Sequence, residues 1–295
     1  MSARFLTVVL ERAFNMRDGF GREIDYMRIS VIDSCNLNCY YCNPCDNNEH
    51  CHALNILSVK EVLCIVRAAT RLGIKHFRLT GGEPLLHPQL DEMVLQIKKI
   101  PGVSSVSLTT NAVLLAQHAK WLKEAGIDSI NVSLDTIDAS EYERITKKPL
   151  LEEVKHGINA AIECGIRVKI NVVLTPQTDV VALTRYVAKK GTDIRFIEMM
   201  PVGEGHTNGV EPYKKVIGTL SKLYGEPCRI NTEKTKEINS GNDKRKIPDN
   251  GPAEYYIFPE LGIRVGLIQA IHGKFCATCN RIRVTADGRL MPCLG

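Results

Sequence analysis

The chain has 295 residues, of which 44% are hydrophobic and 24% are charged. This usage is typical of folded globular proteins and excludes a disordered or fibrous chain. No apolar run approaches the roughly 20 residues that a membrane-spanning helix needs, so we expect a soluble protein. The formal net charge of +5 favours an anionic partner without identifying it.

The cysteine content indicates a reducing compartment. The count of 11 is odd, and the apolar run at the N-terminus is too short for a secretory signal. Disulfides persist mainly in oxidising environments, so we expect none here. We predict a cytoplasmic location, where clustered cysteines more often bind metals or clusters.

Strand-like and helix-like segments alternate six times up to about residue 200. Such alternation predicts a parallel sheet with right-handed crossovers, either an open doubly wound sheet or an incomplete β/α barrel. Ser58 with Glu61 predicts a capping box at the first helix. The predicted strands span 27–32, 76–80, 104–109, 129–134, 168–174 and 194–197, and the helices span 59–72, 90–99, 116–125, 151–164 and 180–189, with glycines at 73, 126, 165 and 191 where four of the helices would end.

A small polar cluster follows each predicted strand, at 33–35, 81–84, 110–111, 135–136, 175–176 and 198–200. These positions are the carboxyl ends of the strands, where active sites of α/β sheets and barrels collect. We therefore expect the loop that begins at 33 to face the Gly81-Gly82-Glu83-Pro84 loop across one mouth.

The pattern changes after about residue 210. One more helix is predicted over 213–223, followed by a polar connector over 229–251 and short antiparallel strands over 255–258, 264–268 and 282–285, with a turn at Asp287-Gly288. We predict two units: a partial barrel over 1–210, and a small α+β module over 211–295 that packs on it.

Three cysteines, Cys35, Cys39 and Cys42, lie just after the first predicted strand. A structural zinc site and a 4Fe-4S cluster held wholly by protein each take four ligands, so three suggest a cluster with one open iron. The Cys-x3-Cys-x2-Cys spacing, with Tyr41 before the last cysteine, resembles the radical S-adenosylmethionine (SAM) superfamily. The resemblance implies that SAM binds the open iron and is cleaved to a 5′-deoxyadenosyl radical. Taken alone, the Gly81-Gly82-Glu83-Pro84 segment predicts a turn, but after the second strand it resembles the superfamily motif that binds the amino group of SAM.

A second set of three cysteines, Cys276, Cys279 and Cys293, lies near the end of the chain. Between them, Arg281 and Arg283 alternate and would point the same way on a strand. Because the guanidinium fork matches phosphate geometry, this pair beside three cysteines favours an anion site.

Both cysteine sets and several further segments resemble the GTP 3′,8-cyclase family, the MoaA proteins of molybdenum cofactor biosynthesis, over residues 17 to 293. The segments that carry the resemblance are 18–22, 28–31, 77–84, 108–111, 131–135 and 195–200. The implied fold is an incomplete (β/α)6 radical SAM barrel with a C-terminal module that carries a second cluster. The implied activity is conversion of GTP to 3′,8-cyclo-7,8-dihydroguanosine 5′-triphosphate.

The resemblance also implies roles at the matching positions. Cys35, Cys39 and Cys42 would bind the first 4Fe-4S cluster, and Cys276, Cys279 and Cys293 the second. SAM would contact Tyr41, Gly82, Ser133 and Met200, and GTP would contact Arg28, Arg78, Thr109, Lys169, Arg281 and Arg283. The implied partners are an electron donor such as flavodoxin or ferredoxin, cyclic pyranopterin monophosphate synthase as receiver of the product, and a second copy of the chain in a homodimer. Nucleic acid and membrane are not implied.

The sequence departs from the family pattern at Ser34, where arginine is usual, and has extra cysteines at Cys45, Cys51 and Cys64. It ends at Gly295, so we expect it to lack the family's C-terminal tail and some of the activity that the tail supports. Two other interpretations stay open. One is a different radical SAM enzyme with an auxiliary cluster, similar to peptide maturases, and the other is a non-catalytic binding module with a zinc site formed by the two Cys-x2-Cys pairs.

Overall fold

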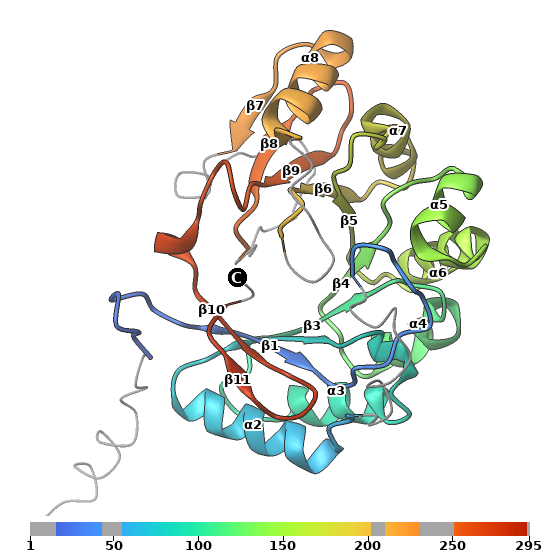
Figure 1. Ribbon diagram of the computed structural model, residues 1–295. Helices are drawn as coiled ribbons and strands as arrows, with labels where there is room; N and C mark the ends of the chain where they lie inside the picture. Colours follow the sequence, from blue (N-terminus) through green and yellow to red (C-terminus); the bar gives the residue numbers. More distant parts are fainter. Residues whose placement is uncertain (1–15, 43–54, 202–209, 231–250, 294–295) are drawn as a thin grey trace, which may run out of the picture.

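The computed structural model describes residues 16–42, 55–201, 210–230 and 251–293. Its strands form one 11-stranded sheet within these residues, in the order β11-β10-β1-β2-β3-β4-β5-β6-β9-β8-β7. The sheet is curled, and helices α2 to α7 cover its outer face (Figure 1). The α/β partial barrel predicted from the sequence is confirmed.

The strands are β1 (Tyr26–Ser30), β2 (His76–Thr80), β3 (Ser105–Thr110), β4 (Ser129–Ser133), β5 (Val168–Val173), β6 (Asp193–Ile197), β7 (Cys228–Ile230), β8 (Glu254–Ile257), β9 (Arg264–Ile268), β10 (Arg281–Val284) and β11 (Leu290–Met291). The helices are α2 (Val59–Arg71), α3 (Leu90–Lys98), α4 (Leu115–Glu124), α5 (Ala139–Thr146), α6 (Leu151–Glu163), α7 (Val180–Lys189) and α8 (Gly218–Tyr224). Short turns of other helix types cover Pro84–Leu86, Tyr213–Ile217 and Cys276–Thr278.

The two faces of the sheet differ in polarity. Outward side chains such as Ile29, Leu79 and Phe196 are fully buried in the main hydrophobic core beneath the helices. Their neighbours along the strands, such as Arg28, Arg78 and Arg195, belong to the opposite, inner face, because successive side chains of a strand alternate. The fold therefore combines an apolar outer layer with a polar interior.

The predicted helix ends agree with the structure. Ser58 Oγ accepts a hydrogen bond from the Glu61 amide at 3.3 Å, and Glu61 Oε2 accepts one from the Ser58 amide at 2.8 Å, which completes the capping box. Gly73, Gly126, Gly165 and Gly191 all have positive φ and follow helices, as residues that leave a helix in the left-handed region do. Helix α5 was not predicted, although Asp138 caps it through the Glu141 amide at 2.8 Å.

The C-terminal strands were predicted to be antiparallel, and this is correct only in part. Strand β9 pairs antiparallel with β8 but parallel with β6, and β10 pairs antiparallel with β11 but parallel with β1. The reason is that β1 and β6 would otherwise leave unpaired backbone groups at both edges of the barrel sheet. The sheet thus runs without a break across residue 210, and the division into units over 1–210 and 211–295 stays a prediction.

Candidate active site

The inner face of the sheet surrounds a cavity of about 740 Å³. It reaches from the loops at the carboxyl ends of the strands, such as the Cys35 loop, to Arg281 and Ser105 at their amino ends. Of the residues predicted to form the site, its wall contains Cys35, Cys39, Cys42, Tyr41, Gly82, Ser133, Arg28, Arg78, Thr109, Lys169 and Arg281. Met200, Arg283, Cys276, Cys279 and Cys293 are not part of this wall.

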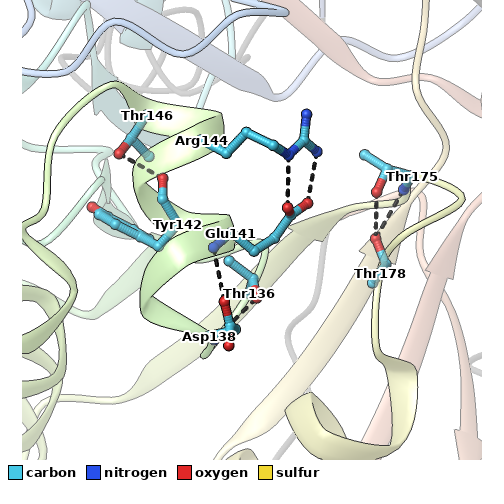
Figure 2. A network of polar contacts seen from close by, with 8 residues as sticks. All are labelled: Thr136, Asp138, Glu141, Tyr142, Arg144, Thr146, Thr175 and Thr178. Carbon is cyan, nitrogen blue, oxygen red and sulfur yellow. Dashed lines mark hydrogen bonds and ion pairs between the residues drawn. The ribbon is translucent and has the colours of Figure 1, made fainter.

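Cys35, Cys39 and Cys42, the first cysteine group, lie on a loop that packs against the end of α5. The Asn38 amide donates to the Thr146 carbonyl at 3.0 Å, and the Tyr40 amide donates to the Ile145 carbonyl at 3.1 Å. Figure 2 shows how α5 is itself fixed: Arg144 forms two bonds of 2.7 Å to Glu141, and Thr146 Oγ1 donates to the Tyr142 carbonyl at 2.8 Å. A secured helix end therefore supports the cysteine loop.

The Gly81-Gly82 segment touches the start of this loop directly. The Gly82 amide donates to the Ile32 carbonyl and the Glu83 amide to the Ser34 carbonyl, both at 2.8 Å. A Cβ atom at Gly82 would lie 2.2 Å from the Ser34 carbonyl oxygen, so no other residue fits without displacing the backbone. The two loops that were predicted to face one another across the mouth are thus in contact.

Glu83 anchors these loops to the end of β3, a role that was not predicted. Its carboxylate accepts from Thr110 Oγ1 at 2.6 Å, the Asn111 amide at 2.7 Å and the Leu85 amide at 3.0 Å. The Asn111 side chain in turn lies 3.8 Å from Cys35 Sγ. Burial raises the pKa of Glu83 to about 6, and the three donors oppose that rise.

A second buried carboxylate, Asp135, holds Tyr41. It accepts hydrogen bonds from the Tyr41 hydroxyl and, at 2.7 Å, from the Val173 amide. Burial raises the pKa of Asp135 to about 6. Burial also raises the pKa of Cys39 to about 12, and the nearby Asp135 adds to this rise because a thiolate would lie beside its negative charge.

The donor set of the first cysteine group fits an iron-sulfur cluster. Burial raises the pKa of Cys35 and Cys42 as well, and the positive charge of bound iron would oppose this rise by stabilising their thiolates. In the parts of the chain that the structure describes, no three His, Cys, Asp or Glu side chains converge on one metal position. A cubane accepts its cysteines on separate irons, whereas zinc draws its ligands to one point. The zinc site formed by Cys39, Cys42, Cys276 and Cys279 therefore does not fit the geometry.

Cys276, Cys279 and Cys293, the second cysteine group, are brought together by the hairpin of β10 and β11. Arg283 pairs with Met291 and Val284 with Leu290. If this antiparallel register is continued by two residues, Cys293 lies opposite Arg281. Arg281 in turn follows Cys279 by two residues. Cys279 and Cys293 are both close enough to Arg283 to raise its pKa. Burial and the charge of Arg281 outweigh this effect and lower the pKa of Arg283 overall.

The two cysteine groups lie near opposite ends of the cavity. Strands β1 and β10 are parallel neighbours, and the first group follows β1 whereas Cys276 and Cys279 precede β10. At about 3.3 Å per residue, the length of β1 alone separates the groups by roughly 15 Å. A ligand in the cavity can thus lie between them. Arg22 Nη1 donates to the carbonyl of Cys276, in the second group, at 2.6 Å.

Arg28, Arg78 and Arg283, which we call the arginine row, occupy one level on three adjacent strands. Among the described residues no carboxylate forms an ion pair with any of them. Burial, followed by the charges of Arg283 and Arg78, lowers the pKa of Arg28 to about 9. Neighbouring positive charges without carboxylate partners repel one another and destabilise the folded protein. An anionic ligand would relieve this repulsion, so the row suits one.

The other predicted GTP contacts, Thr109, Lys169 and Arg281, line the cavity together with Arg28 and Arg78 of the row. Arg78 Nε donates to the Tyr26 hydroxyl, and Arg78 Nη1 lies 3.3 Å from Thr109 Oγ1. Lys169 is buried and pairs in register with Asn131. Glu83, Asn111 and Asp135 also line the wall, and they belong to the polar clusters predicted at the carboxyl ends of the strands. Sequence reasoning missed four further wall residues, Asn131, Arg167, Asn171 and Arg195. For Asn131, Arg167, Asn171 and Arg195 the available signal was polar side chains at every second position of the strands in a predicted parallel sheet.

Of the three extra cysteines, the structure describes only Cys64. Cys64 is exposed on α2, while Cys45 and Cys51 lie outside the described residues. Ser34, at the position where arginine is usual, contributes its carbonyl to the contact with Glu83. No helix in the described part of the chain has the length and apolar character to cross a membrane.

Comparison with known proteins agrees with this geometry. The model of the radical SAM superfamily matches residues 29–183, and the Molybdenum Cofactor Synthesis C model matches residues 192–295. A GTP 3′,8-cyclase of Clostridium perfringens (strain SM101 / Type A) is 37% identical over 282 residues, which are 95% of this chain and 83% of that protein. One of Pelotomaculum thermopropionicum is 38% identical over 286 residues, which are 95% of this chain and 84% of that protein. The chain belongs to the GTP 3′,8-cyclase family of radical SAM proteins.

Solved structures support the fold alone, because their sequence identity is low. Streptococcus suis SuiB bound to S-adenosylmethionine matches with a TM-score of 0.63 and 15% identity, over 92% of this chain and 60% of that chain. Methylornithine synthase (PylB) matches with a TM-score of 0.54 and 17% identity, over 77% of this chain and 70% of that chain. Membership of the radical SAM superfamily implies one 4Fe-4S cluster and SAM as cofactors. The family assignment made from the sequence motifs is thus confirmed.

Proposed function

We propose that the chain converts GTP to 3′,8-cyclo-7,8-dihydroguanosine 5′-triphosphate in molybdenum cofactor biosynthesis. The observation that carries this proposal is the order of groups along the cavity: the first cysteine group at one end, the second near the other, and the arginine row between them. A triphosphate of about four negative charges would relieve the repulsion among these guanidinium groups.

The predicted residues then have distinct tasks. Cys35, Cys39 and Cys42 would hold the first 4Fe-4S cluster, and Tyr41, Gly82, Ser133 and Met200 would position SAM. When bound, this pair supplies a 5′-deoxyadenosyl radical that takes a hydrogen from the ribose 3′ carbon of GTP. Cys276, Cys279 and Cys293 would hold a second 4Fe-4S cluster, which would bind the guanine base. Arg28, Arg78, Thr109, Lys169, Arg281 and Arg283 would bind GTP.

The protein itself contributes positioning and exclusion of water. Glu83 and Asp135 keep the SAM-binding loops in place through buried hydrogen bonds. The arginine row would fix the triphosphate and thereby the ribose. We further propose flavodoxin or ferredoxin as electron donor, cyclic pyranopterin monophosphate synthase as receiver of the product, and a homodimer as the assembly.

The test is anaerobic reconstitution with iron and sulfide, followed by incubation with SAM, GTP and dithionite. We expect close to eight irons per chain, and formation of 5′-deoxyadenosine together with a cyclised guanosine triphosphate. ATP in place of GTP serves as the matched control and should give no cyclised product. A chain that binds only four irons, or that cleaves SAM and leaves GTP unchanged, would favour a different radical SAM activity.

A further inference from the structure

Arg167 lies directly before β5, on the inner face of the sheet. Alternation places it with Lys169 and Asn171, and all three line the cavity. Because Ile130 pairs with Val168, Arg167 falls opposite Ser129 on the neighbouring strand. Its position is thus fixed by the register of β4 and β5 and not by a loop.

The register also puts Arg167 on the level of the arginine row. Ser129 pairs with Ser107 of β3, and Ser107 pairs with Arg78 of β2. Only these two serines separate Arg167 from the row along this level, and the sheet curls between β2 and β5 (Figure 1). Arg167 therefore approaches the cavity from the wall that faces the arginine row.

The guanidinium group of Arg167 has capacity for a ligand. Its Nη2 atom is shielded from solvent and has no hydrogen-bond partner. In the described ranges no carboxylate forms an ion pair with Arg167. Asp128 lines the same cavity, but its carboxylate pairs with Lys98 Nζ at 2.9 Å and accepts from the Val106 amide at 2.7 Å. A guanidinium N–H that is shielded from solvent and has no acceptor destabilises the folded protein, unless an anion accepts its hydrogen bond.

We infer that Arg167 is a further binding residue for the triphosphate of the substrate, and that it holds the triphosphate from the wall opposite the arginine row. This inference rests on the proposed function, because it takes GTP as the ligand. The planar fork of arginine can hold two phosphate oxygens at once, which lysine and glutamine cannot do. Contact from two walls would fix the phosphate chain across the cavity and orient the ribose.

The test compares Arg167→Gln with the parent in anaerobically reconstituted protein. Arg67→Gln, an exposed position on α2, is the matched control. Calorimetry would give the dissociation constants of GTP, GDP and GMP. A charge-assisted hydrogen bond corresponds to roughly a 10-fold to 100-fold change in affinity. We expect Arg167→Gln to weaken GTP binding by about tenfold or more and GMP binding much less. Arg167→Lys should lie between the parent and Arg167→Gln.

Each outcome decides the inference. If the parent binds GTP and Arg167→Gln binds it equally well at unchanged iron content, the inference is wrong and the proposed function stands. Equal weakening of GTP and GMP would also overturn it, because the contact would then not involve the outer phosphates. If the parent binds no GTP, the proposed function fails, and the inference fails with it.

Discussion

The first and second cysteine groups are held by different parts of the fold. The first is spread over eight residues, and neighbouring loops of the barrel fix it through Glu83, Gly82 and the end of α5. The second depends on a hairpin whose outer strand, β11, has two residues and lies at the edge of the sheet, with Leu290 exposed. Edge strands have fewer partners and open more readily. The structure thus couples a rigid site to a more easily opened one, and each can be disturbed separately.

The largest expected effect comes from removing one ligand of each group. Cys39→Ala should abolish SAM cleavage, because the electron path to SAM begins at the first cluster. Cys279→Ala should leave SAM cleavage with dithionite measurable but stop formation of the cyclised nucleotide. Both products can be quantified in one anaerobic assay. If Cys39→Ala cleaves SAM at the parent rate, the assignment of the first group is wrong.

Gly82→Ala should damage the first group and spare the second. The added Cβ would lie 2.2 Å from the Ser34 carbonyl oxygen and 2.5 Å from that of Asp33. Overpacking against backbone costs about 1–3 kcal/mol or more, so we expect a lower melting temperature and weaker SAM binding. Gly19→Ala, where nothing lies within 4 Å, is the control. Normal SAM binding by Gly82→Ala would contradict the close contact between the loops.

Glu83→Gln tests how the barrel holds the first group. The substitution places an amide donor among the groups that donate to Glu83, so it should lower stability by about 1–3 kcal/mol. Because the folded-state pKa of Glu83 is raised from 4.5 to about 6, the parent gains stability from protonation below about pH 4.5 and loses it as the pH rises through 6. This shift of the Glu83 pKa corresponds to about 2 kcal/mol in the free energy of unfolding.

The difference in melting temperature between the parent and Glu83→Gln should therefore narrow from pH 5 to pH 7, measured before cluster reconstitution. Exposed Glu124→Gln serves as the control. A difference that widens over this range would show that the hydrogen bonds to Glu83 outweigh its burial.

The smallest effect is expected at the turn of the second group. Thr285 Oγ1 accepts from the Arg289 amide at 3.0 Å, and the Thr285 amide donates to the Arg289 carbonyl at 2.9 Å. The Thr285 hydroxyl also donates to the Asp287 carboxylate and, at 3.1 Å, to the Arg289 carbonyl. Thr285→Val removes all of these side-chain bonds, and we expect a cost of about 1 kcal/mol because the turn is exposed. Iron release to a chelator should then become faster for about half of the iron. Thr184→Val is the control, because the Thr184 hydroxyl has no hydrogen-bond partner. Equally faster release of all the iron would show that the hairpin does not control the second group alone.

Most of the barrel could be predicted from the sequence because its signals are local. Apolar runs, helix periodicity and glycines such as Gly73 and Gly126 report on a few neighbouring residues. The cysteine spacing is local too, and it led to the radical SAM assignment and to the prediction of a second cluster. Helix α5 was missed because it is short and its apolar face is narrow, although Asp138 and Glu141 carry a capping signal.

The rest depended on contacts between distant residues. Nothing within 281–284 indicates that these residues pair with 26–29, because the free edge of β1 exists only in the folded barrel. The same holds for Glu83, whose partners Thr110 and Asn111 follow the next strand. A carboxylate in a loop is usually solvated, and only the assembled site buries it. The polar inner face could have been recognised from the polar residues at every second position of the strands.

The pairing of both sheet edges with C-terminal strands has a consequence for how the chain folds. Arg28 and Arg283, which are neighbours in the arginine row, are joined only after synthesis has passed residue 283. Until then β1 and β6 present open edges on the ribosome, as slow-folding parallel sheets of high contact order do. The substrate pocket is therefore among the last parts of the protein to form during synthesis, and until then the open edges of β1 and β6 can pair with strands of other chains.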